Sequence, residues 1–255
     1  MTAALAISIA PEAAQAEALR ERVHVLESRA GVREVLLVTE GSTWRGSHQH
    51  SVIILGGGGG GFAVTCPEGL PCVQGGLPLD QRHRLAHAIG GPVLALSPPT
   101  DRPVMDREWR MSDRHVADLE AAVSWSKTQW PQAQTWVLGL NSGALSAAVA
   151  TASIEELAGA ILLSCAEEAF DQPQKSDRMR ILAIRHRRDA SPSYTTLAHT
   201  RGRKTLVTVH DERTQRSQGM SNEAANRPQF AGKEYQVVDV VARWILTGTA
   251  PDEIR

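Results

Sequence analysis

The stretch that decides the fold is residues 134–143, QTWVLGLNSG, an apolar run that ends in regularly spaced glycines. The run predicts a buried strand, and the small residues that follow, GALSAAVATA, predict a helix that packs closely on a sheet. Between them, Gly139, Asn141 and Gly143 form a G-x-N-x-G pattern. This pattern predicts a sharp strand-to-helix turn whose centre is ordinarily a nucleophilic serine and is here asparagine.

Predicted strands and helices alternate along the rest of the chain. The first two strands, 23–28 and 33–40, form a hairpin. The segment 51–55, SVIIL, is wholly apolar, which is typical of a strand covered on both faces. The other predicted strands are 91–96, 135–140, 160–165, 180–185 and 204–210, and the helices are 80–90, the segment after Ser112, 143–152 and 234–246. This order predicts an α/β fold with a mostly parallel central sheet and helices on both faces.

Length and composition indicate one globular domain. The chain has 255 residues, of which 42% are hydrophobic and 22% charged, and its formal net charge is −1. We expect residues 1–22 to form an N-terminal tail or helix and residues 23–255 to form a single domain. The balanced charge argues against a nucleic acid or a membrane surface as the main partner and favours a small molecule. The sequence leaves the oligomeric state open, with a homodimer as one alternative.

No cofactor or metal ion is expected from the residue spacings. Cys66 and Cys72 are close enough in sequence to close a small loop, but free thiols are the favoured reading. No zinc-type cysteine spacing occurs, and His48 and His50 have no further recognisable ligands in what we expect to be a polar loop. The N-terminus lacks the positively charged start of a secretory signal, so we expect a cytoplasmic protein, with a trimmed signal as the alternative.

Four stretches, in order, resemble a bacterial group of α/β hydrolases. They are VIILGGGGGG at 52–61, WRMSDRHVADLEAAVSW at 109–125, WVLGLNSGALSAA at 136–148 and FAGKEYQVVDVVARWI at 230–245. The resemblance covers roughly residues 23–247 and implies the α/β-hydrolase fold. In that family a serine attacks an acyl carbon, a histidine takes its proton, and an acid orients the histidine.

The resemblance implies a role for several positions of this chain. Asn141 occupies the nucleophile position, and Asp189 occupies the position of the acid. The backbone N–H of Ser142 and those of the glycine loop, with Gly57 and Gly58 as the expected donors, would stabilise an oxyanion.

The catalytic histidine of the family is not found at its usual place. The residues that precede the Phe-x-Gly-x-Glu stretch are Arg227, Pro228 and Gln229. His210, directly after a predicted strand, is the remaining candidate for the base, although a partly exposed histidine at a strand end is the favoured reading.

Three interpretations of Asn141 stay open at the sequence level. In the first, the protein acts on a small acyl or carbonyl compound without a covalent intermediate, as a lyase, isomerase, cyclase or general-base hydrolase. In the second, the turn survives in a catalytically inactive pseudo-hydrolase that binds a ligand or serves as a scaffold. In the third, Asn141 is an engineered replacement that inactivates a serine esterase.

Overall fold

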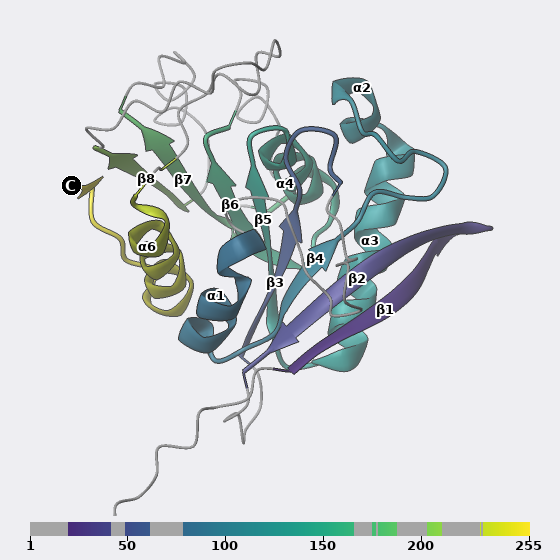
Figure 1. Cartoon of the computed structure of the whole chain (residues 1–255), viewed down its shortest axis with the longest axis horizontal. Helices are drawn as coiled ribbons and strands as arrows, with labels where there is room; N and C mark the ends of the chain where they lie inside the picture. Colours follow the sequence, from purple (N-terminus) through teal and green to yellow (C-terminus); the bar gives the residue numbers. More distant parts are fainter. Residues whose placement is uncertain are drawn as a thin grey trace, which may run out of the picture.

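A computed structural model describes residues 20–41, 49–61, 79–165, 175–176, 178–187, 203–210, 230 and 232–255. Its centre is a nine-stranded sheet with the strand order β1-β2-β4-β3-β5-β6-β7-β8-β9 (Figure 1). The strands are β1 Arg20–Arg29, β2 Val32–Glu40, β3 His50–Leu55, β4 Val93–Leu96, β5 Gln134–Leu140, β6 Leu157–Leu163, β7 Arg180–His186, β8 Arg203–Val209 and β9 Glu253–Ile254.

The sheet is mostly parallel, as predicted. β1 and β2 form an antiparallel hairpin, and β2 pairs antiparallel with β4, whereas every other pair of neighbours is parallel. The hairpin turns at Gly31, whose φ of 72° is readily adopted only by residues such as glycine. β1 begins at Arg20, so three residues assigned to the predicted tail 1–22 belong to the sheet. The rest of that tail lies outside the described residues.

Helices cover both faces of the sheet, which confirms the predicted layers. The helices are α1 Arg82–Ile89, α2 Arg107–Arg110, α3 Asp113–Gln129, α4 Ser142–Ser153 and α6 Glu234–Thr247, and η1 Leu79–Gln81 is a 3-10 turn before α1. α3 and α4 pack on one face, and α1 and α6 on the other (Figure 1). Each face therefore buries its own apolar core, and each fully buried leucine or isoleucine contributes about 1.5–3 kcal/mol.

Capping residues fix where the helices near the site begin. The Ser112 hydroxyl accepts a hydrogen bond from the His115 N–H at 3.3 Å and so caps α3, as predicted. Asp106 caps the short helix α2 by accepting from the Trp109 N–H at 2.8 Å. Neither α2 nor the edge strand β9 is predicted by the sequence pattern. No helix in the described part of the chain is long and apolar enough to cross a bilayer.

Candidate functional site

Asn141 is the centre of a sharp turn between β5 and α4. Its φ of 50° and ψ of −117° lie outside the regions that side chains favour, which costs on the order of 1–3 kcal/mol. The turn is held by the Asn141 N–H, which donates to the Leu163 carbonyl oxygen at 2.9 Å. Gly139 and Gly143 pass so close to neighbouring backbone that an added Cβ would lie 2.1 and 2.2 Å from carbonyl oxygens. The G-x-N-x-G spacing thus has a steric cause.

The glycine loop after β3 lies against this turn through Gly57. A Cβ on Gly57 would lie 2.8 Å from the carbonyl oxygen of Leu140 and 3.8 Å from the Cβ of Asn141. Gly58 is exposed, and a Cβ there would meet nothing within 4 Å. The structure therefore brings Gly57 to the turn, whereas Gly58 lies farther out in the same loop.

A buried arginine holds the glycine loop from below. Arg110, at the end of α2, is fully buried, and its Nη2 donates to the carbonyl oxygens of Gly56 at 3.0 Å and Gly58 at 2.9 Å. In a planar trans peptide the C=O and the following N–H point in opposite directions. Arg110 therefore turns the N–H of Gly57 away from itself, and this leaves that donor available on the side of the loop away from the core.

The second anchor of Arg110 is Ser146 in α4. Nη1 of Arg110 donates to the Ser146 hydroxyl at 2.7 Å, and Nε2 of His115 lies 2.9 Å from the same oxygen. Burial, with the positive charges of Arg110 and Arg29, lowers the pKa of His115 to about 3, so its ring is neutral. Burial also lowers the pKa of Arg110, to about 10, which still leaves it charged at neutral pH. The glycine loop is thus held by hydrogen bonds from one buried, positively charged side chain, Arg110.

Three polar groups lie at the turn, one side-chain oxygen and two backbone N–H donors. The side-chain Oδ1 of Asn141 is buried and has no hydrogen-bond partner within the described part of the chain. Ser142 is the first residue of α4, and N–H groups in a first helical turn have no intrahelical acceptor. Two backbone donors, Gly57 and Ser142, thus lie beside one side-chain acceptor. This arrangement suits a compound with both a carbonyl oxygen and a polar hydrogen.

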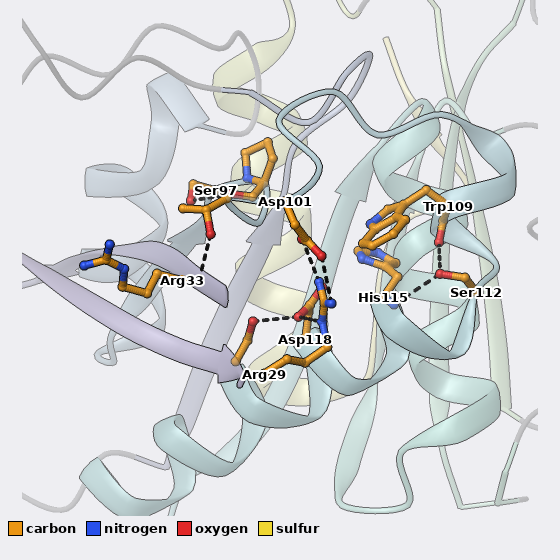
Figure 2. Close-up of polar contacts among 11 residues, drawn as sticks. Arg29, Arg33, Ser97, Asp101, Trp109, Ser112, His115 and Asp118 are labelled. Carbon is orange, nitrogen blue, oxygen red and sulfur yellow. Dashed lines mark hydrogen bonds and ion pairs between the residues drawn. The ribbon is translucent and has the colours of Figure 1, made fainter. Parts of the chain in front are cut away.

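An ionic network ties α3 to β1 near the start of the helix (Figure 2). The guanidinium of Arg29 binds Asp118 at 2.7 Å and Asp101 at 2.9 Å, and it lies 5.4 Å from the ring centroid of Trp109. Beside this network, burial and, secondarily, the charge of Asp118 raise the pKa of Glu34 to about 8. The network fixes α3, and therefore His115, against the sheet.

His210 lies at the same end of the sheet as Asn141 but three strands away from it. It follows β8, its N–H donates to the Ile254 carbonyl oxygen at 2.8 Å, and its Nε2 lies 3.4 Å from Oε1 of Glu253. β8 is three strands from β5, which is roughly 14 Å at the usual strand spacing. The structure therefore pairs His210 with an edge-strand carboxylate and does not bring it to the turn. Its role as a base stays a prediction.

Several residues from the sequence analysis lie outside the described residues: Asp189, Cys66, Cys72, His48 and the segment 227–229. His50, which was expected in a polar loop, is instead the first residue of β3. It is buried, and the Trp136 indole N–H donates to its Nδ1 at 3.3 Å. His50 is therefore a core residue. Within the described chain, no three His, Cys, Asp or Glu residues cluster as metal ligands do.

Three polar residues around the turn were not predicted as part of the site. Ser146 was predicted only as part of a helix and Ser164 only as part of a strand, and no element was predicted at Arg110. Ser164 follows β6 beside Asn141 and has a φ of 44°, the only other positive value at a described non-glycine residue. No signal in the sequence identifies Arg110, because only the fold brings it close to the carbonyl oxygens of Gly56 and Gly58.

Comparison with protein-family models and with curated protein sequences finds no match. Solved structures do match. A dienelactone hydrolase from Anabaena variabilis has a TM-score of 0.59 at 13% identity, and the match covers 89% of this chain and 97% of that one. An α/β serine hydrolase without a lid from Xanthomonas campestris has a TM-score of 0.58 at 15% identity, with coverage of 91% and 97%. The chain therefore has the α/β-hydrolase fold.

Proposed function

We propose that this protein binds a small acyl or carbonyl compound at Asn141 and acts on it without a covalent acyl intermediate. The observation that carries the proposal is the retained turn. Asn141 keeps a strained positive φ beside Gly57, although asparagine is no nucleophile. Backbone strain of this kind persists where the surrounding structure enforces it, and it concentrates at binding and catalytic sites.

The chemistry follows from the donors at the turn. The N–H groups of Gly57 and Ser142 would bind a carbonyl oxygen and stabilise negative charge that develops on it. The Asn141 Oδ1 would accept a hydrogen bond from an N–H or O–H of the same compound. Hydrolases that lose their catalytic side chains keep about 10³–10⁴-fold acceleration over water from such donors and from substrate binding. A reaction through an enolate or a water attack needs no more than this polarisation and a base.

Primary carboxamides test the binding step, because they carry both a carbonyl oxygen and an N–H donor. We expect acetamide and benzamide to give saturation-transfer NMR signals with the full chain, and N,N-dimethylbenzamide, which lacks the N–H, to give weaker ones. The Asn141→Gly variant should lose the difference between benzamide and its dimethyl analogue. Equal signals from both proteins with both compounds would refute the proposed site.

A ligand-binding pseudo-hydrolase is the second candidate, and the position of His210 favours it. With its Nε2 beside Glu253, His210 is not placed to take a proton at Asn141. The two candidates differ in turnover. An enzyme releases p-nitrophenol from p-nitrophenyl acetate without an acyl-protein adduct in the mass spectrum, and His210→Ala abolishes that release if His210 is the base. A binding protein gives no release above the rate measured with the same protein after heat denaturation.

A further inference from the structure

A cavity lies at the opposite end of the sheet from Asn141. Its volume is about 620 Å³, within the range of roughly 300–1,000 Å³ typical of small-molecule sites. The cavity is lined by residues at the amino ends of four parallel strands, among them Gln134 of β5 and Leu157 of β6. β5 thus has this cavity at its first residue and the Asn141 turn directly after its last. The two sites are therefore separate.

Three arginines line this cavity: Arg178, Arg180 and Arg203. Arg180 and Arg203 are the first residues of β7 and β8 and pair in the sheet register, so their positive charges lie side by side. Glu155 is the one carboxylate among the described lining residues. No carboxylate of the described chain lies within ion-pair distance of any of the three arginines. Among the described lining residues, three positive charges therefore face one negative charge.

The central arginine is held in place by aromatic rings. The guanidinium of Arg180 lies 4.9 Å from the ring centroid of Trp136 and 4.5 Å from that of Trp244, and its Nη2 donates to the Trp244 carbonyl oxygen. Burial and the neighbouring charge of Arg203 lower the pKa of Arg180. A guanidinium fixed in this way loses little conformational entropy when it binds an anion.

We propose that this cavity binds a small molecule that carries a phosphate group. Arginine forks match the geometry of phosphate oxygens and bind them through paired hydrogen bonds. Arg178 and Arg203 are exposed and form no ion pair with another described residue, whereas Arg180 is held against the rings of Trp136 and Trp244. The bound anion would also remove the repulsion between Arg180 and Arg203. The volume leaves room for an organic group beside the phosphate, against the apolar Leu157 and Met179.

Thermal unfolding of the full chain with matched ligand pairs tests this proposal. Glucose 6-phosphate is compared with glucose, and pyrophosphate with potassium chloride at equal ionic strength. We expect saturable stabilisation by the phosphate compounds alone, with apparent affinity at least tenfold weaker in the Arg178→Gln/Arg203→Gln double variant. Both side chains are exposed and form no ion pair within the described part of the chain, so this variant should fold. Arg243→Gln, an exposed arginine on α6 outside the cavity, is the control and should bind as the wild type does.

Two results would overturn the proposal. One is stabilisation by phosphate compounds no greater than that by chloride or glucose. The other is equal stabilisation of the wild type and the double variant, which would place the anion elsewhere on the protein. Neither result bears on the carboxamide site, because the Asn141→Gly comparison uses neutral ligands at the other end of β5.

Discussion

Arg110 binds the carbonyl oxygen of Gly58 from beneath the glycine loop, at 2.9 Å, although its own side chain is fully buried. A charged group in the core is stable only when its hydrogen bonds are made, and here the partners are backbone carbonyls and a serine. The orientation of the expected oxyanion donor therefore depends on a residue that no ligand touches.

The first prediction concerns this contact. Arg110→Met preserves much of the side-chain volume but leaves the carbonyl oxygens of Gly56 and Gly58 without their donor. Each buried group left unpaired costs about 1–3 kcal/mol, so we expect the free energy of unfolding to fall by about 2–4 kcal/mol. Carboxamide signals should also weaken, because the peptide between Gly56 and Gly57 is no longer held in the orientation that points the Gly57 N–H toward a ligand. Urea unfolding measures the first effect and saturation-transfer NMR the second.

A matched control is available on α3. Arg114 is exposed, and Arg114→Met should change stability by no more than about 0.5 kcal/mol. An Arg110→Met protein as stable as this control would show that the glycine loop does not rely on the buried cation.

The second prediction separates strain from function at Asn141. The φ and ψ of this residue mirror an extended conformation, which glycine adopts readily. We expect Asn141→Gly to raise the free energy of unfolding by about 1 kcal/mol and to remove the preference for benzamide over N,N-dimethylbenzamide. A stabilised protein that has lost this preference would show that the strain is kept for the ligand. A destabilised Asn141→Gly protein would contradict the assignment of strain.

The third prediction addresses the interpretation of Asn141 as an engineered replacement. We expect Asn141→Ser to show no burst of p-nitrophenol from short p-nitrophenyl esters, because His210 lies beside Glu253 rather than at the turn. A serine hydroxyl without a base keeps its proton and attacks slowly. The double variant Asn141→Ser/Ser142→Ala guards against attack by the neighbouring hydroxyl. A burst from both variants, with an acyl adduct, would identify a serine hydrolase that asparagine had inactivated.

Much of the fold could be predicted from the sequence because its strands are short apolar runs and its glycines are tightly spaced. The run SVIIL and the pattern around Asn141 gave β3, β5 and the turn that joins β5 to α4. The buried polar contacts around the turn could not be predicted in the same way. Nothing in the polar segment around Arg110 indicates that the fold brings its guanidinium to the carbonyl oxygen of Gly56. His50 looked like part of a loop because its partner, Trp136, is distant in sequence.

The position of His210 shows the same limit. Chain order alone made it the candidate base, since it follows the strand after which the family places its histidine. The strand β9, only two residues long, carries no periodic pattern that predicts it. Its pairing with β8 is what brings Glu253 to His210. Chain order thus made His210 a candidate base, but its actual partner is Glu253 on β9, a strand that the sequence does not predict.

The last prediction concerns pH and Glu34. Glu34 is buried on β2, and its Oε2 has no hydrogen-bond partner among the described residues. Burial raises its pKa in the folded protein to about 8, above the ordinary 4.5. Below pH 4.5 it is protonated in both states and has no effect. Between pH 5 and 8 the unfolded chain loses this proton and the folded chain retains it, which makes unfolding easier as the pH rises, by at most about 1.4 kcal/mol per pH unit.

Glu34→Gln mimics the protonated acid and cannot ionise. We therefore expect the variant to match the wild type near pH 5 and to exceed its stability at pH 8, with a flatter profile between them in urea unfolding. Glu120→Gln, an exposed carboxylate on α3, should leave the slope of the wild type unchanged. A Glu34→Gln profile parallel to that of the wild type would mean that Glu34 is ionised in the folded protein. In that case the positive charge of Arg29 would stabilise ionised Glu34 as well as Asp118, with which it forms an ion pair.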